Sequence, residues 1–229
     1  MIRHWENWDS GEIAREVDQY WHESKTEQEW RRTVVRDMVK VLPLEMGILD
    51  VGCGSGAIYE ELIKHGFGTS RPYVGGDTST KMLEIAHNRF PAAQFMAMDI
   101  FNLPFKDHSQ PIVLCINVLQ HLPGYWLALA ELARVTGSML YITTWFKRGR
   151  QNNIRLVKSQ WGPDFYQNEY SLRPFQDFAR GIEGVKGIDT RCLCRSKYAF
   201  GVKGITRLTP ATFRVLIEKE EHGEAKDIK

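Results

Sequence analysis

The chain has 229 residues, a formal net charge of +2 and 43% apolar residues, values that are ordinary for one α/β domain with additions around its core. No apolar run approaches the roughly 20 residues that a membrane-spanning helix needs. The opening segment MIRHWENWDSGE lacks the apolar centre of a signal peptide, so we expect a cytoplasmic protein with no membrane partner.

Residues 1–46 are expected to form an N-terminal helical extension that acts as a lid. Ser10 can cap a helix that runs to about residue 22, and Thr26 can cap a second one. Pro43 ends the second helix, because proline cannot continue the hydrogen-bond ladder.

The segment from Gly47 to Ala57, GILDVGCGSGA, predicts a strand, a tight turn and the start of a helix. Glycine supplies the positive φ angles that such a turn needs and lets a ligand approach the backbone. The free N–H groups of the helix's first turn favour a negatively charged group on that ligand. Gly52, Gly54 and Ala57 also satisfy the pattern G-x-G-x-x-G/A, so a nicotinamide or flavin enzyme is an alternative.

The wider pattern Asp50-x-Gly-x-Gly-x-Gly, within LDVGCGSG, resembles motif I of class I S-adenosylmethionine-dependent methyltransferases. This resemblance implies a doubly wound, Rossmann-like α/β fold with a mostly parallel sheet of seven strands, here over residues 47–220. S-adenosylmethionine carries a carboxylate, an ammonium and a sulfonium but no phosphate. Asp50, at the end of the strand, can meet the cationic methionine portion of such a cofactor.

Two further acids follow the next two predicted strands. Asp77 ends the strand that begins at Tyr73, and at this place a carboxylate can accept hydrogen bonds from both ribose hydroxyls. Asp77 could also cap the following helix. By resemblance, Asp99 accepts from the adenine amino group, and Ile100 offers a backbone N–H. This third acid favours S-adenosylmethionine over a dinucleotide.

The apolar run at residues 111–117 predicts a central parallel strand buried on both faces. The segment that starts at Asn117 resembles motif IV of the family and should border the methyl group. His121 follows, and a neutral imidazole there can take the proton of a hydroxyl as it is methylated. A packing role without catalytic duty is the alternative for His121. No Asn/Asp-Pro-Pro-Tyr/Phe and no Pro-Cys is present, which argues against adenine, glutamine and cytosine carbon-5 methylation.

Together, the resemblance and the residue types give one set of predicted cofactor contacts. They are Asp50, Gly52, Cys53, Gly54, Gly56, Asp77, Thr78, Met82, Asp99, Ile100, Asn117 and Val118.

Residues 147–174 form a long, irregular connection after the fifth predicted strand, and such connections are usually functional or disordered. In the family this connection commonly shapes the acceptor pocket, and N-terminal helices cover part of it. The predicted substrate contacts are therefore Tyr20, Trp21, Arg148, Arg150, Tyr166, Glu169 and Tyr170.

The remaining elements complete the family's sheet. A helix is predicted over residues 175–182 with Ser171 as its N-cap, followed by extended segments at 187–198 and 211–219. By resemblance, the last strand lies antiparallel between the fifth and sixth. Residues 221–229 are polar and are expected to be disordered.

Cysteine spacing and charge distribution limit the possible partners. Cys53, Cys115, Cys192 and Cys194 form no CxxC pair and no zinc spacing, so we expect reduced thiols and no metal. Residues 147–207 hold thirteen Lys or Arg against five Asp or Glu. This basic part can attract an anionic substrate or a nucleic acid, although solvated loops and a charged sheet edge explain it equally well.

We therefore expect methyl transfer from S-adenosylmethionine to a small molecule, on a hydroxyl oxygen of a sugar, polyketide or similar metabolite. Two alternatives remain. The first is RNA or protein methylation, which the basic C-terminal part favours. The second is a protein that binds S-adenosylmethionine or S-adenosylhomocysteine without transferring methyl. The acids at positions 50, 77 and 99 do not separate these three cases. The sequence does not indicate an oligomeric state.

Overall fold

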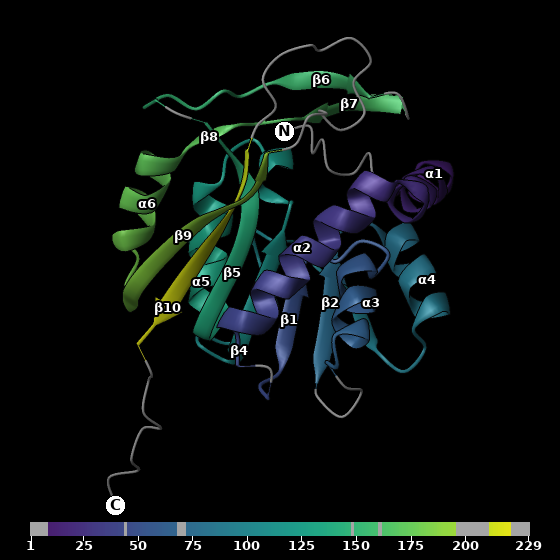
Figure 1. Ribbon diagram of the computed structural model, residues 1–229, viewed down its shortest axis with the longest axis horizontal. Helices are drawn as coiled ribbons and strands as arrows, with labels where there is room; N and C mark the ends of the chain where they lie inside the picture. Colours follow the sequence, from purple (N-terminus) through teal and green to yellow (C-terminus); the bar gives the residue numbers. More distant parts are fainter. Residues whose placement is uncertain are drawn as a thin grey trace, which may run out of the picture.

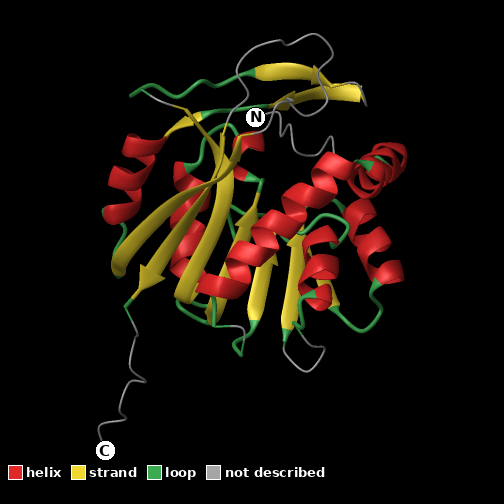
Figure 2. Cartoon of the chain, viewed as in Figure 1, coloured by secondary structure: helices red, strands yellow, loops and turns green. Residues whose placement is uncertain are grey.

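A computed structural model describes residues 9–43, 45–67, 72–147, 149–159, 162–195 and 211–220. Its centre is a twisted β-sheet with the strand order β3-β2-β1-β4-β5-β10-β9 (Figures 1 and 2). The strands are β1 (Ile48–Val51), β2 (Tyr73–Asp77), β3 (Gln94–Ala97), β4 (Gln110–Ile116), β5 (Thr136–Lys147), β9 (Val185–Arg195) and β10 (Ala211–Lys219).

The directions of the strands are those of the predicted class. β1 pairs in parallel with β2 and β4, and β2–β3 and β4–β5 are also parallel. β10 lies between β5 and β9 and is antiparallel to both. The doubly wound, mostly parallel sheet and the position of its last strand are thus confirmed.

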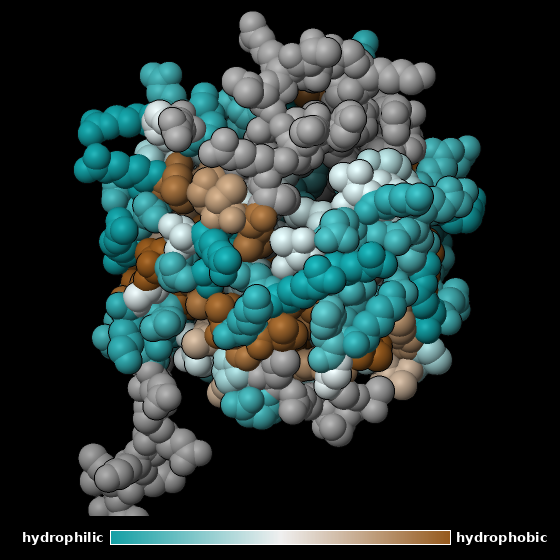
Figure 3. All heavy atoms as spheres, viewed as in Figure 1, coloured by the Kyte–Doolittle hydropathy of each residue, from teal (hydrophilic) through white to brown (hydrophobic). Residues whose placement is uncertain are grey.

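Helices cover both faces of the sheet and each face has its own apolar core. The helices are α1 (Gly11–Glu23), α2 (Lys25–Val41), α3 (Ala57–Lys64), α4 (Thr80–Arg89), α5 (Trp126–Val135) and α6 (Leu172–Arg180), with a 3₁₀ turn η2 at Leu119–His121. α2 crosses in front of β1 and β4 (Figure 1). Figure 3 shows hydrophilic atoms along its outer side and apolar atoms beside it, as expected for an amphipathic helix. No helix in the described ranges is long and apolar enough to span a membrane.

The two N-terminal helices form where the sequence predicts them, but one predicted cap is wrong. The side chain of Ser24 accepts the Glu27 N–H and starts α2, whereas Thr26 lies inside its first turn. Ser24 forms the cap because it is the single residue between the two helices and has the extended conformation that an N-cap needs.

Residues 147–174 are more regular than predicted. They contain a two-stranded antiparallel sheet, β6 (Leu156–Ser159) with β7 (Gly162–Tyr166), and a short strand β8 (Tyr170–Ser171) that pairs with β5. The hairpin lies beyond the upper ends of the main strands in Figure 1. Ser171 precedes α6 as predicted, but its hydroxyl donates to the carbonyl of Gly149 and makes no cap bond. The tail at 221–229 lies outside the described residues.

Among the described residues, Cys53, Cys115 and Cys192 form no disulfide. The side chain of Cys194 lies outside the described part of the chain. Among the described residues, no group of three or more His, Cys, Asp or Glu side chains is arranged to hold a metal ion.

Candidate functional site

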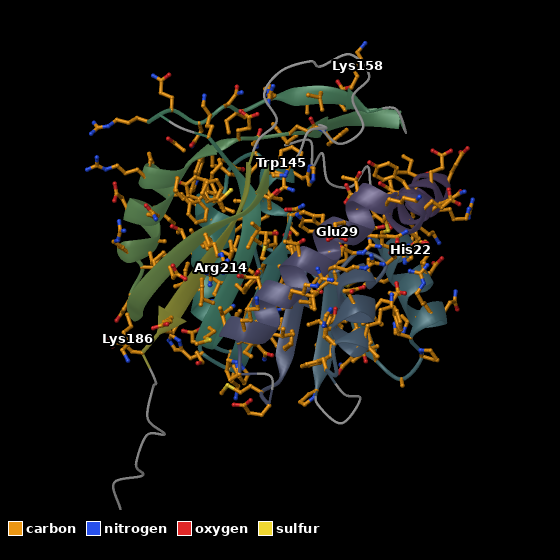
Figure 4. The ribbon with its side chains drawn as sticks, in the orientation of Figure 1. His22, Glu29, Trp145, Lys158, Lys186 and Arg214 are labelled. Atoms are coloured by element: carbon orange, nitrogen blue, oxygen red, sulfur yellow. The ribbon has the colours of Figure 1, made fainter. Side chains whose placement is uncertain are left out.

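A cavity of about 710 Å³ lies between the N-terminal helices and the carboxyl ends of the parallel strands. In sheets of this kind, ligands bind at that edge, and the volume is in the upper part of the usual range for small-molecule sites. Its wall follows the strand order, from Asp99 after β3 and Asp77 on β2 to the turn after β1. It continues to Asn117 after β4 and Trp145 on β5 (Figure 4).

The turn after β1 lines the cavity with its bare backbone. Gly52 and Gly54 have φ angles of +81° and +54°, which side chains rarely adopt. A Cβ atom on Gly54 would lie 2.9 Å from the ring of Trp21, and one on Gly52 would overlap Val118. The sequence keeps glycine here because both the backbone conformation and the close neighbours require it.

Asp77 ends β2 and holds this turn in place. One carboxylate oxygen accepts the N–H of Gly54 and the other accepts the N–H of Ser79, both at 2.9 Å. Burial raises the pKa of Asp77, while these two hydrogen bonds act in the opposite direction. The helix cap is formed by Ser79, whose hydroxyl accepts the N–H of Met82. Asp77 therefore supports the turn and the helix start while it faces the cavity.

Asp99 and Ile100 line the next part of the wall, beyond β3. One oxygen of Asp99 accepts the backbone N–H of Phe101 at 2.9 Å. This bond fixes the carboxylate at the end of the cavity beyond β3. Thr78, Met82 and Cys53, three of the predicted cofactor contacts, also line the cavity.

Asp50 and Gly56, two other predicted cofactor contacts, are not part of the cavity wall. Asp50 is 1% exposed, and it accepts the hydroxyl of Tyr73 at 2.8 Å. Burial raises the pKa of Asp50 to about 7, with the Tyr73 bond opposing and Asp77 adding to the effect. Its Oδ1 atom has no hydrogen-bond partner among the described residues. Gly56, at φ +80°, starts α3 and packs against Phe90.

Asn117 follows β4 in a left-handed conformation, with φ of +55°. Its backbone N–H donates to the carbonyl and the hydroxyl of Thr143, and its side-chain oxygen accepts from the same hydroxyl at 3.1 Å. Non-glycine residues in this conformation cluster at functional sites. Asn117 and Val118 both border the cavity, as predicted.

His121 lies at the far end of the cavity, in η2. Its Nδ1 is 2.8 Å from the carbonyl oxygen of Tyr166. Because a carbonyl only accepts, Nδ1 carries the proton and Nε2 holds the lone pair in the neutral ring. Gln120 Nε2 lies 3.4 Å from that nitrogen. Burial lowers the pKa of His121 to about 4, and the bond to Tyr166 offsets only part of this effect.

The predicted lid residues take different places. Trp21 lines the cavity and covers the turn at Gly54. Tyr20 is half-buried and outside the cavity wall. Neighbouring residues on a helix point about 100° apart, so only one of this pair faces the ligand side.

Four predicted substrate contacts from residues 147–174 are described by the structure, and none of them lines the cavity: Arg150, Tyr166, Glu169 and Tyr170. Arg150 is exposed, and Arg148 lies outside the described residues. Glu169 forms an ion pair with Arg155 at 2.8 Å. Tyr170 is fully buried, and its hydroxyl donates to the carbonyl of Leu119 at 2.6 Å.

Tyr166 reaches the site indirectly, because its backbone carbonyl holds His121. In the described part of residues 147–174, polar side chains bond to one another and to the neighbouring backbone. β6 and β7 pair beyond the ends of the main strands, and their side chains do not line the cavity.

Several residues on the cavity wall were not predicted as contacts. They include Lys25, Thr26, Glu27, Glu29, Trp30, Arg31 and Thr33 on α2, together with Gln120, Leu122, Trp145 and Thr212. Thr26, Glu29, Trp30 and Thr33 recur at helical spacing, so one face of α2 could have been recognised as a candidate roof. For Trp145 and Thr212 no local signal exists, because they meet only through strand pairing.

Arg31 is the most unusual of these residues. It is 7% exposed and donates to the backbone carbonyl of Trp21 at 2.7 Å. Burial lowers its pKa, and the carboxylates of Glu27, Glu60 and Glu61 oppose this shift. A nearly buried guanidinium on a cavity wall is expensive unless it meets an anion.

These features fit S-adenosylmethionine. Asp99 and Asp77 are placed for the adenine and ribose, and the glycine turn leaves room for the chain that follows. The guanidinium of Arg31 on the cavity wall suits a carboxylate, whereas Asp50 is buried outside that wall. Asp99, Asp77 and the glycine turn follow the strand order β3-β2-β1, and this order suits the adenine, ribose and methionine parts of the cofactor.

Comparison with known proteins agrees with this geometry. Residues 49–139 match the sequence family described as "Methyltransferase domain". The chain is 31% identical over 125 residues to the 27-O-demethylrifamycin SV methyltransferase of Amycolatopsis mediterranei, covering 51% of this chain and 45% of that protein. It is 33% identical over 109 residues to the demethylmenaquinone methyltransferase of Staphylococcus aureus, covering 46% and 44%. The chain spans about half the length of the curated relatives it matches.

A solved structure extends the likeness over nearly the whole chain. Phosphoethanolamine N-methyltransferase 2 of Haemonchus contortus, in complex with S-adenosyl-L-methionine, has a TM-score of 0.68. The match covers 96% of this chain and 60% of that one, at 13% sequence identity. At that identity, the match concerns the fold.

Proposed function

We propose that this chain carries a class I, Rossmann-like methyltransferase domain and that it transfers the methyl group of S-adenosylmethionine to a hydroxyl oxygen of a small molecule. The observation that carries this proposal is one continuous cavity. It has the cofactor residues at its β3 end and a neutral histidine at its β5 end. Similarity to methyltransferases named for rifamycin and menaquinone precursors supports a small-molecule acceptor.

The cofactor end of the cavity contains the residues that would bind and orient S-adenosylmethionine. Asp99 and the N–H of Ile100 would hold the adenine, and Asp77 would hold the ribose. The turn around Gly54 would carry the methionine chain, with Arg31 on its carboxylate. When bound, the cofactor supplies a methyl group that the positive sulfur has already activated.

The protein's main task is then alignment and the exclusion of water. Orientation of this kind can lower a barrier by up to roughly 7–11 kcal/mol. Trp21 covers the glycine turn, and α2 closes the cavity over β1 and β4. Both helices would exclude water and hold the reacting oxygen in line with the methyl group.

His121 would accept the proton of the acceptor hydroxyl at Nε2. With a pKa of about 4 it is a weak base. It is sufficient, because the proton becomes strongly acidic once the oxygen gains the methyl group. The carbonyl of Tyr166 keeps the ring in the tautomer that leaves the lone pair on Nε2, where the side-chain nitrogen of Gln120 lies 3.4 Å away.

The low pKa of His121 gives a testable pH profile. A histidine of ordinary pKa near 6.5 would lose activity as the pH falls below that value. His121 stays neutral until the pH approaches 4, so we expect turnover to change less than twofold between about pH 7.5 and 5.5. The measurement is kcat at saturating cofactor and acceptor.

The His121→Ala variant should lose about 10²- to 10⁴-fold in kcat. Near-normal turnover in that variant would dismiss the catalytic role.

Arg31 can be tested by binding alone. We expect Arg31→Met to weaken S-adenosylhomocysteine binding by about 1.5–3 kcal/mol, because a charge-assisted hydrogen bond is lost. Binding of 5′-methylthioadenosine, which lacks the amino-acid portion, should stay unchanged. Isothermal titration of both ligands gives the two values, and Arg32→Met serves as the exposed control. Equal losses for both ligands would show that Arg31 acts through the fold.

The activity itself is tested by incubating the protein with methyl-labelled S-adenosylmethionine and fractionated cell extract. We expect the label in small metabolites. Label in RNA, with steep salt dependence of RNA binding, would instead support the basic C-terminal part as a nucleic-acid surface. Tight cofactor binding without turnover on any fraction would favour a non-catalytic binding protein.

A further inference from the structure

Among the described residues, four carboxylates line the cavity: Glu27, Glu29, Asp77 and Asp99. Asp77 and Asp99 accept backbone N–H groups of the neighbouring turns. The side chain of Glu29 is 62% exposed and forms ion pairs with two arginines of its own helix. The side chain of Glu27 is half-buried, and within the described ranges it has neither a hydrogen bond nor an ion pair. Glu27 is therefore the cavity carboxylate whose role is still open.

A helix-capping role does not explain Glu27. The spacing Ser24-x-x-Glu27 has the form of a capping box, in which the glutamate side chain accepts the backbone N–H of the serine. Here the Ser24 N–H donates to the carbonyl of Tyr20 at 2.9 Å and so closes the last turn of α1. The Ser24 hydroxyl caps α2 by accepting the Glu27 N–H. The carboxylate of Glu27 thus lines the cavity without a capping bond.

Glu27 and Arg31 are one helical turn apart on α2, and both line the cavity. Side chains at this spacing lie on one face of a helix, with Cβ atoms about 5–6 Å apart. No ion pair joins them, because Arg31 donates to the carbonyl of Trp21 at 2.7 Å. The other carboxylates near Arg31, on Glu60 and Glu61, pair with a lysine of α3.

The charges of Glu27 and Arg31 only partly stabilise each other. Burial raises the pKa of the Glu27 carboxyl and lowers the pKa of the Arg31 guanidinium, and the mutual attraction offsets part of each shift. Charges taken out of water are costly unless they are paired and hydrogen-bonded. A ligand that carries both an ammonium and a carboxylate would supply the missing partner of each.

Trp21 connects this pair to the glycine turn. Its carbonyl accepts from Arg31, and its ring would lie 2.9 Å from a Cβ atom on Gly54. The methionine part of S-adenosylmethionine, which the turn would carry, has an ammonium and a carboxylate on one carbon. Asp50, the acid that the sequence suggests for the cationic part, is 1% exposed and lies outside the cavity wall.

We propose that Glu27 binds the ammonium of the cofactor's amino-acid portion while Arg31 binds its carboxylate. The two side chains then form one recognition element for an α-amino acid in its zwitterionic form. Glu27 takes no part in the chemical step, and its role is to bind and orient the cofactor. The proposal deepens the methyltransferase function stated above and depends on it.

The test compares two ligands of the full-length protein by isothermal titration. One is S-adenosylhomocysteine, and the other is its deamino analogue, in which a hydrogen replaces the ammonium group and the carboxylate is kept. The wild type should bind S-adenosylhomocysteine at least about tenfold more tightly, because the analogue leaves the Glu27 carboxylate without a partner.

Three variants locate the effect. Glu27→Gln, which keeps the size but removes the charge, should weaken S-adenosylhomocysteine binding about 10- to 100-fold and should not weaken binding of the deamino analogue. Glu27→Asp, which keeps the charge on a shorter side chain, should retain part of the preference. Glu23→Gln is the matched control, since Glu23 is exposed at the end of α1 and lies outside the cavity wall. It should bind both ligands as the wild type does.

Equal affinity of the wild type for the two ligands would overturn the proposal. So would a folded Glu27→Gln variant that binds S-adenosylhomocysteine as tightly as the wild type, or that loses affinity for both ligands equally. Thermal unfolding followed by circular dichroism shows whether the variant is folded. In these cases the wild type still binds S-adenosylhomocysteine, and the proposed function stands. Failure of the wild type to bind S-adenosylhomocysteine would instead remove the methyltransferase function, and the role of Glu27 with it.

Discussion

Replacing Asp37 by alanine is expected to lower the free energy of unfolding by about 3–5 kcal/mol. Asp37 is 6% exposed on α2 and accepts the hydroxyl of Tyr141 at 2.9 Å. It also forms ion pairs with Arg214 at 3.2 Å and Arg191 at 3.6 Å. Arg214 is itself only 3% exposed, so loss of the carboxylate leaves this guanidinium with Asp189 as its remaining ion-pair partner and removes the acceptor of the Tyr141 hydroxyl.

This group of residues fixes α2 to the sheet. Tyr141 lies on β5, Arg214 on β10 and Arg191 on β9, so Asp37 ties the helix to three strands. Burial raises the pKa of Tyr141, and the nearby Asp37 charge raises it further. Because α2 also carries Trp30 and Arg31, loosening it should weaken cofactor binding as well as stability.

Urea unfolding monitored by circular dichroism measures the effect. Asp177→Ala, which removes an exposed carboxylate with only surface partners, should change the stability by no more than about 0.5 kcal/mol. The double variant Asp37→Leu/Arg214→Leu should be destabilised by less than the sum of the two single changes. Additive losses would mean that the pair does not act as a unit.

Asp77→Ala is expected to weaken S-adenosylhomocysteine binding by about 1–3 kcal/mol. The ribose hydroxyls would lose their acceptor. In addition, the N–H groups of Gly54 and Ser79 would lose the carboxylate that now holds the turn and the start of α4. Isothermal titration gives the affinity, and circular dichroism confirms that the variant is folded.

A ligand pair separates the two contributions. The wild type should bind S-adenosylhomocysteine more tightly than its 2′-deoxy analogue, and Asp77→Ala should lose this preference. Asp77→Asn, which keeps one side-chain oxygen, should retain part of it. An unchanged affinity in folded Asp77→Ala would contradict the assignment of Asp77 to the ribose.

The part of the cavity formed by the glycine turn, Asp77 and Asp99 could be predicted from the sequence, because the sequence patterns that indicate it are local. The spacing of Gly52, Gly54 and Gly56 reflects backbone angles that few other residues adopt. Asp77 and Asp99 each follow an apolar run that reads as a strand, and parallel strands bring their carboxyl ends to one edge. The structure places Asp77 and Asp99 on one cavity wall.

The part of the cavity around His121 and Trp145 depended on contacts that no local pattern encodes. Residues 147–174 have the composition of a binding loop, yet Glu169 forms an ion pair with Arg155 and the Tyr170 hydroxyl donates to the carbonyl of Leu119. His121 could be predicted from the sequence as a candidate base. Its low pKa could not be predicted, because it comes from burial in the folded chain.

By itself, the sequence determined the strand, turn and helix of motif I, the placing of the acids on successive strands, and so the fold and the cofactor. These follow from glycine's backbone freedom and from apolar periodicity, which act over a few residues. Only the tertiary structure decided that Trp30, His121, Trp145 and Thr212 line one cavity, and that Arg31 is buried beside Trp21. Those residues are brought together by strand order and by the docking of α2, which depend on packing across the whole chain.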